Sequence, residues 1–149
     1  NFGLPPFLSP DAGVNSGFMV AEITSAALMS ENKHLANSCS TDSTPTSADQ
    51  EDHVSMSSYA ARRLIKMADN LGRILGIELL TAAQGLEFRK PLSTSTTLRR
   101  VLAELRSSVS PLQEDRCLSP DIEEATKLIR NGKLKQATGD VQFPSLEHT

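Results

Sequence analysis

Residues 47–85 read SADQEDHVSMSSYAARRLIKMADNLGRILGIELLTAAQG, and apolar side chains recur in them at intervals of three and four. One helical face is traced by seven positions at this spacing: Ala60, Leu64, Met67, Leu71, Ile74, Glu78 and Ala82. Ser47 and Gln50 form an N-terminal capping pattern, and Gly85 is a typical helix stop. The pattern predicts a long core helix over residues 49–84.

Such a helix is too long for a compact domain of 149 residues. At ~1.5 Å per residue it would span ~52 Å, whereas a globule of this size has a diameter near ~40 Å. Residues 74–83, ILGIELLTAA, are apolar on nearly every side and therefore need protein all around them. We expect an all-α, long-helix bundle that is incomplete in this chain and is completed by further sequence, by other subunits, or by both.

The rest of the chain is divided between loops and shorter helices. The expected elements are a Pro-rich loop at 1–16, a helix at 17–35, a Ser/Thr-rich loop at 37–48, C-terminal helices within 96–132 and a loosely ordered tail at 133–149. The last helix is expected to take Ser119 as its N-cap and Pro120 as its first residue, and to close at Asn131-Gly132.

Composition excludes several classes of protein. Fifteen Lys and Arg against 18 Asp and Glu give a net charge of −3, without the positive excess that a nucleic-acid or membrane-surface binder needs. No apolar run approaches the ~20 residues of a membrane span, and no signal peptide is expected because the first residues lack a basic segment followed by an apolar one. Two distant cysteines, Cys39 and Cys117, favour the reducing cytoplasm.

The densest polar cluster is Gln50-Glu51-Asp52-His53. At a predicted helix start it is explained either by capping and compensation of the helix dipole or by a carboxylate presented to a binding cleft. A metal site is not expected, because none of the three histidines stands at a ligand spacing from another His, Cys or carboxylate. G-x-S-x-G, G-x-G-x-x-G and P-loop patterns do not occur.

Several ordered motifs point to one family. They are NFGLPPFL (1–8), GVNSGFM (13–19), SENK (30–33), PTSA (45–48), QEDHVSM (50–56), AARR (60–63), IELL (77–80), AQG (83–85) and PDIE (120–123). In this order they resemble the C-terminal portion of the histidine ammonia-lyases, within the aromatic amino acid lyase family. The resemblance covers residues 1 to about 132 and fades after Leu134.

The resemblance implies a fold, a reaction and an assembly. The fold is a bundle of very long helices of the aromatic amino acid lyase and fumarase–aspartase type, shared between the subunits of a homotetramer. The reaction is elimination of ammonia from L-histidine to give trans-urocanate in histidine degradation. It uses no metal but a methylidene-imidazolone group, formed from an Ala-Ser-Gly triplet. The one Ser-Gly here is Ser16-Gly17, preceded by Asn15, so the triplet is expected upstream of Asn1.

The resemblance also assigns roles to residues. Glu51 matches the active-site glutamate, which contacts the substrate imidazole or transfers a proton, and Met19 matches a methionine that lines the pocket. Gln50, Asp52 and His53 belong to the same motif and are expected to support Glu51. Relatives specific for phenylalanine or tyrosine carry other residues at the two matched positions, so the Met19/Glu51 pair favours histidine.

Two departures from the family pattern and two alternatives remain. Asp49 stands where many relatives have an uncharged residue, and Asn37-Ser38-Cys39 replaces a His-Pro segment. One alternative is a non-catalytic helical oligomerisation module. The other is a phenylalanine or tyrosine ammonia-lyase or aminomutase of the same family.

Overall fold

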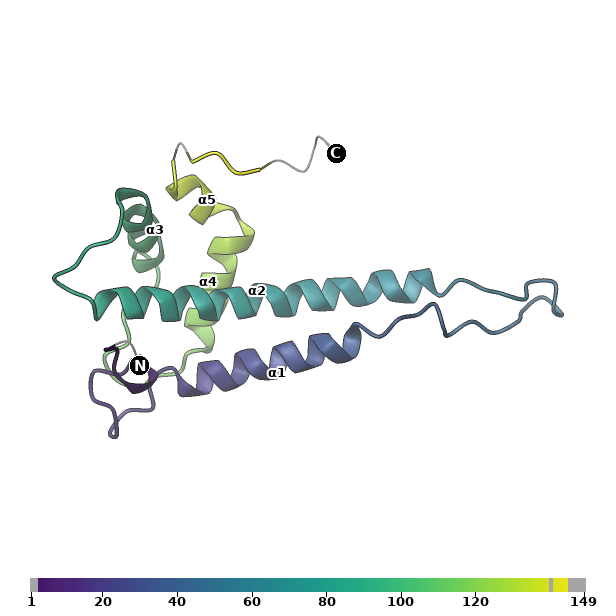
Figure 1. The fold of residues 1–149 in the computed structure, drawn as a ribbon, viewed down its shortest axis with the longest axis horizontal. Helices are drawn as coiled ribbons and strands as arrows, with labels where there is room; N and C mark the ends of the chain where they lie inside the picture. Colours follow the sequence, from purple (N-terminus) through teal and green to yellow (C-terminus); the bar gives the residue numbers. More distant parts are fainter. Residues whose placement is uncertain (1–2, 140, 145–149) are drawn as a thin grey trace.

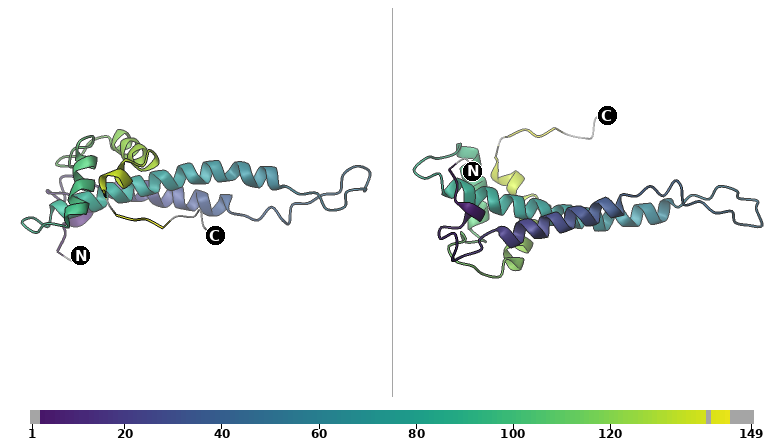
Figure 2. Two further views of the ribbon diagram at one scale, coloured as in Figure 1. Left: turned by 90° about the horizontal axis from the view of Figure 1, so that it is seen from above. Right: turned by 60° about the horizontal axis from the view of Figure 1, so that its bottom comes forward.

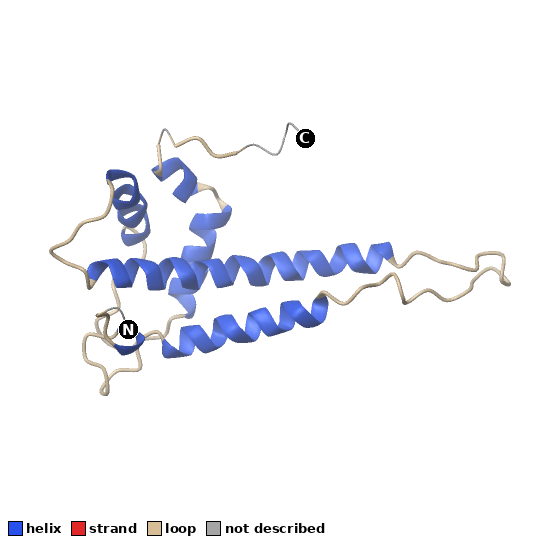
Figure 3. Ribbon diagram, in the orientation of Figure 1, coloured by secondary structure: helices blue, strands red, loops and turns tan. Residues whose placement is uncertain are grey.

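The computed structural model describes residues 3–139 and 141–144. In order, its helices are η1 (Pro6–Leu8), α1 (Met19–Leu35), α2 (Ser57–Glu87), α3 (Thr96–Arg106), α4 (Ser119–Arg130) and α5 (Lys133–Ala137). Within this part of the chain there is no strand, only two isolated bridges (Figure 3). The expectation of an all-α fold is confirmed.

The molecule is an elongated helical hairpin with a helical cluster at one end. α1 and α2 run antiparallel side by side, and residues 36–56 form the long loop that extends beyond both (Figure 1). α4 crosses α2, and α3 and α5 pack together beside it, as a second viewpoint also shows (Figure 2). At this end lies the core: Phe18, Ala21, Ile77, Leu80, Ala83, Leu105, Val109, Leu112, Ala125 and Leu128.

The long helix does not span 49–84 as the sequence predicted, and both boundaries were wrong. It begins at Ser57, because Ser47, Ala48 and Asp49 adopt φ values of 55°, 53° and 65°. Three successive left-handed residues cannot belong to a right-handed helix, so Ser47 caps nothing.

At its other end the long helix passes through Gly85 and stops at Glu87. The Glu87 carboxylate accepts two hydrogen bonds from Arg106, at 2.7 and 3.1 Å. This pairing ties the last turn of α2 to α3.

The predicted apolar face of α2 is not the face that this chain buries. Leu64 is 61% exposed and Leu71 51% exposed, and Leu75 is exposed as well. The face buried against α1 and α4 instead consists of Asn70, Gly72, Gly76, Ile77, Leu80, Ala83 and Gln84. At 31 residues, or ~46 Å, α2 therefore carries two contact faces, and only one of them is covered within the chain.

Smaller corrections apply elsewhere. α4 includes Ser119 as its first residue and has Leu118 as its N-cap, one position earlier than predicted. The 1–16 loop contains η1, and the 133–149 tail begins with α5. The end of that tail, residues 140 and 145–149, lies outside the described residues, as do residues 1 and 2.

Gly76 allows α4 to approach α2 closely. A Cβ atom at position 76 would lie 2.8 Å from Thr126 Oγ1 and 3.2 Å from the backbone oxygen of Ile122. The Thr126 hydroxyl cannot easily turn away, because it donates to the Ile122 carbonyl at 2.7 Å. The crossing of the two helices therefore depends on the missing side chain.

We expect Gly76→Ala to lower the free energy of unfolding by about 1–2 kcal/mol, because overpacking against α4 outweighs the gain in helix propensity. Gly85→Ala is the matched control in the same helix. Its Cβ would meet only Leu4 and Leu8 side chains at 3.8 and 4.0 Å, so a gain of about 0.5–1 kcal/mol is expected. Urea midpoints that shift in the same direction for both variants would contradict the close approach.

In the described part of the chain, no helix combines the length and the apolar character that crossing a membrane requires.

Candidate functional site

Glu51 belongs to the loop of residues 36–56 between α1 and α2. This loop extends away from the helical cluster that holds the core (Figure 1). Its backbone forms a bridge with Thr46, with N···O distances of 3.0 and 3.3 Å. The Thr46 hydroxyl donates to Glu51 Oε2 at 3.2 Å. The side chain is exposed, and Oε1 has no hydrogen bond within the described residues. The loop thus fixes the Glu51 backbone and leaves one carboxylate oxygen available to a donor from outside.

The polar cluster around Glu51 is not at a helix start, contrary to the sequence expectation. Gln50, Asp52 and His53 lie in turns and bends, all three exposed, and α2 begins only at Ser57. Neither capping nor the helix dipole therefore explains this cluster, because a dipole acts only within the first turn.

A cavity of about 320 Å³ lies beside this loop. It is lined by Cys39, Ser40, His53, Val54, Ser55, Met56, Ser57 and Ala60. Cys39 belongs to the segment that departs from the family pattern, and its Sγ accepts a hydrogen bond from the Arg63 guanidinium at 2.9 Å. The same guanidinium donates to the Asn37 carbonyl at 2.6 Å, which joins the base of the loop to α2.

Met19 lies at the opposite end of the hairpin. It is the first residue of α1, half-buried, and follows Phe18, which belongs to the core. The whole of α1, ~24 Å of helix, separates it from the loop that carries Glu51. One copy of the chain therefore does not bring Met19 and Glu51 together.

The structure reveals a polar clamp on the start of α1 that sequence reasoning missed. The Asp115 carboxylate accepts hydrogen bonds from the backbone N–H groups of Ser16 at 2.7 Å and Gly17 at 2.9 Å. In return, the backbone N–H of Asp115 donates to Asn15 Oδ1 at 3.0 Å. The two N–H donors hold the pKa of the Asp115 carboxyl below its usual value, so it is ionised at neutral pH.

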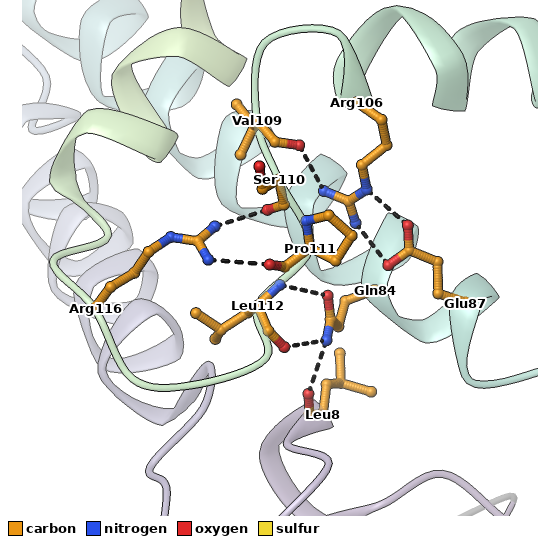
Figure 4. A network of polar contacts seen from close by, with 9 residues as sticks. All are labelled: Leu8, Gln84, Glu87, Arg106, Val109, Ser110, Pro111, Leu112 and Arg116. Carbon is orange, nitrogen blue, oxygen red and sulfur yellow. Dashed lines mark hydrogen bonds and ion pairs between the residues drawn. The ribbon is translucent and has the colours of Figure 1, made fainter.

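The stretch that carries Asp115 is in turn anchored to α2 by Gln84, which is 2% exposed (Figure 4). Gln84 Nε2 donates to the Leu112 carbonyl at 2.8 Å and to the Leu8 carbonyl at 3.4 Å. Gln84 Oε1 accepts from the Leu112 N–H at 3.1 Å. A motif, AQG at 83–85, pointed to this residue, but nothing in the sequence indicated its partners, which lie 28 and 76 positions away.

The described residues contain no group of three or more His, Cys, Asp or Glu that could hold a metal ion. Asn15-Ser16-Gly17 does not fit the prosthetic group that the resemblance implies. Asn15 stands where the triplet has alanine, and the N–H groups of Ser16 and Gly17 donate to Asp115.

Comparison with known proteins identifies the family. The family model for aromatic amino acid lyases matches residues 1–107. The chain is 61% identical to a histidine ammonia-lyase from Roseobacter denitrificans over 134 residues. This alignment covers 90% of the chain and 26% of that protein.

Solved structures agree with this match. A histidine ammonia-lyase from Trypanosoma cruzi has a TM-score of 0.87 and 41% identity, over 98% of this chain and 31% of that one. A tyrosine aminomutase from Streptomyces globisporus has a TM-score of 0.89 and 32% identity, over 96% of this chain and 28% of that one. The chain thus spans about a quarter to a third of the length of the relatives it matches. From a match over most of its length, we conclude that this chain belongs to the aromatic amino acid lyase family.

Proposed function

We propose that the chain is part of a histidine ammonia-lyase, which eliminates ammonia from L-histidine to give trans-urocanate in histidine degradation. The observation that carries the proposal is Glu51, which stands in the QEDH motif with one exposed carboxylate oxygen free to accept a hydrogen bond. The 61% identity to the Roseobacter denitrificans enzyme supports histidine as the substrate.

In this proposal Glu51 binds the substrate imidazole. A carboxylate beside the ring N–H orients the ring and favours its protonated form. Met19 lines the pocket and contacts the ring, whereas Gln50, Asp52 and His53 keep the loop in shape. A loop that fixes the Glu51 backbone through Thr46 suits this task, because the carboxylate needs no reorganisation when the substrate arrives.

We infer that the active enzyme is a homotetramer whose sites are shared between subunits. Met19 and Glu51 lie at opposite ends of the hairpin, so a pocket that contains both needs at least two copies of this segment. The exposed Leu64, Leu71 and Leu75 of α2 offer an apolar face for helices of other subunits or of the remaining sequence.

The electrophile of the reaction is a methylidene-imidazolone group, which activates the substrate for loss of ammonia. We assign it to an Ala-Ser-Gly triplet outside these 149 residues, since the chain has no such triplet. The use of Cys39 and Cys117 as free thiols supports placing the enzyme in the cytoplasm.

The isolated 149-residue chain is expected to produce no urocanate from histidine, because it lacks the electrophile. The absorbance of urocanate measures this directly. The positive control is the complete protein, by which we mean the full-length polypeptide of which this chain is proposed to be a part. Turnover by the isolated chain would refute the assignment of the electrophile to another part of the protein.

A phenylalanine or tyrosine lyase or aminomutase is the second candidate, favoured by the TM-score of 0.89 to the tyrosine aminomutase. Rates of the complete protein with histidine, phenylalanine and tyrosine, together with the identity of each product, separate the two. A complete protein that converts none of the three would instead support a non-catalytic helical module.

A further inference from the structure

The backbone immediately before Met19 is held from two sides. On one side the Asp115 carboxylate accepts both N–H groups of Ser16 and Gly17. On the other the Phe18 N–H donates to the Phe7 carbonyl at 2.9 Å. The N–H groups of three successive residues, 16 to 18, are thus fixed up to the first residue of α1, and the direction in which the Met19 side chain leaves the backbone is fixed with them.

Gly17 makes this arrangement tight. Its φ of +56° is one that other residues rarely adopt, and a Cβ atom there would lie 2.5 Å from the Phe7 backbone oxygen. Position 17 therefore has no room for a side chain, because the backbone passes close to η1 there. When the hydrogen bonds to Asp115 are lost, only the hydrogen bond from Phe18 to Phe7 remains of these two contacts, and Met19 is no longer held in its place.

The stretch that carries Asp115 is itself rigid. Gln84 holds Leu112 by both backbone groups. Arg116 donates to the carbonyls of Ser110 at 2.7 Å and Pro111 at 3.0 Å (Figure 4). It also pairs with Asp121 of α4. Gln84 of α2 thus holds the short segment 112–115, and Asp115 at its end holds Ser16 and Gly17, just before Met19.

We propose that Asp115 is a positioning residue that sets the place of Met19 in the substrate pocket and thereby tunes binding of the substrate side chain. Asp115 lies beyond residue 107, where the match to the family model ends. The inference rests on the proposed function, because it takes Met19 as a residue that contacts the substrate.

The test is Asp115→Asn in the complete protein. One side-chain oxygen is replaced by an NH₂ group that cannot accept a hydrogen bond, so either Ser16 or Gly17 loses its acceptor. We expect KM to rise about fivefold and kcat to stay within about twofold, because Met19 contacts the ring and not the reacting atoms. Glu114→Gln, the same change of charge at the exposed neighbouring residue, is expected to leave both constants unchanged.

A double-mutant cycle shows whether Asp115 acts through Met19. In a Met19→Ala background, Asp115→Asn is expected to change KM less than about twofold further, because the side chain being positioned is already gone. An equal rise of KM in both backgrounds, or the same rise in Glu114→Gln, would overturn the proposal. If Asp115→Asn does not fold, the same double-mutant cycle is measured with Asn15→Ala. This variant removes the hydrogen bond from the Asp115 N–H to Asn15 Oδ1.

The experiments distinguish a failure of the proposed function from a failure of the positioning role of Asp115. Wild-type protein that converts tyrosine or phenylalanine and not histidine would refute the substrate, and the cycle would then be run with the amino acid that is converted. Calorimetric dissociation constants for the three amino acids provide a readout independent of turnover. Wild-type protein that neither binds nor converts any of them would overturn both proposals.

Discussion

Glu51→Gln in the complete protein is expected to lower kcat/KM for histidine at least tenfold, which corresponds to ~1.4 kcal/mol in the barrier. The carboxylate is proposed to form a charge-assisted hydrogen bond with the imidazole, and such bonds contribute ~1.5–3 kcal/mol. Glutamine keeps the shape and one acceptor oxygen but loses the charge. Initial rates of urocanate formation over a range of histidine concentrations measure the effect.

The structure makes this a clean experiment, because the substitution leaves the loop intact. The bridge between Thr46 and Glu51 uses backbone atoms, and the Thr46 hydroxyl can donate to an amide oxygen as it does to Oε2. Asp42→Asn is the matched control, an exposed acid in the same loop, and is expected to retain wild-type kinetics. Equal kcat/KM values for Glu51→Gln and wild type would sink the role given to this residue.

Gln84→Leu is expected to lower the free energy of unfolding by about 2–4 kcal/mol. Leucine fills a similar volume, so little cavity is created, but the buried N–H and C=O of Leu112 lose their partners. Each unsatisfied buried group costs about 1–3 kcal/mol. Urea midpoints measured by helical circular dichroism, at one fixed protein concentration because assembly contributes to stability, provide the comparison.

The control for this prediction is Gln113→Leu, which makes the same chemical change at the exposed residue next to Leu112. We expect its midpoint to lie close to that of the wild type. A Gln84→Leu midpoint that equals the Gln113→Leu midpoint would show that the network in Figure 4 contributes nothing to stability.

The existence of α2 could be predicted from the sequence, but its boundaries and its buried face could not. The spacing of apolar residues indicates that a helix has an apolar stripe, but it does not indicate which face of the helix the chain buries. In this chain the buried stripe contains Gly72 and Gly76, where the close crossing of α4 requires small residues, and Asn70, which donates hydrogen bonds to Glu31 and Asn32 of α1. None of these three residues contributes to an apolar pattern. The apolar stripe at Leu64 and Leu71 is left exposed.

Similar limits apply to the candidate site. Glu51 and Met19 were predicted from short motifs that resemble a known family, and such motifs can be read without knowledge of the fold. Asp115 carries no such signal: it is an exposed aspartate in a loop, and its role follows from Ser16 and Gly17, 99 and 98 positions away. Contacts across that separation arise from the tertiary structure, in which Gln84 of α2 binds Leu112 in the same loop as Asp115.

The amino-acid sequence alone established that this chain is helical, that its longest helix needs more protein than the chain supplies, and which acid is the candidate for catalysis. These properties depend on local spacing and on short motifs, both of which involve residues close together in the sequence. The tertiary structure alone showed that Met19 and Glu51 lie at opposite ends of the hairpin, and that Gln84 and Asp115 hold the start of α1. These are long-range arrangements, and they depend on how closely two helices can pack and on which buried backbone groups still need a hydrogen-bond partner.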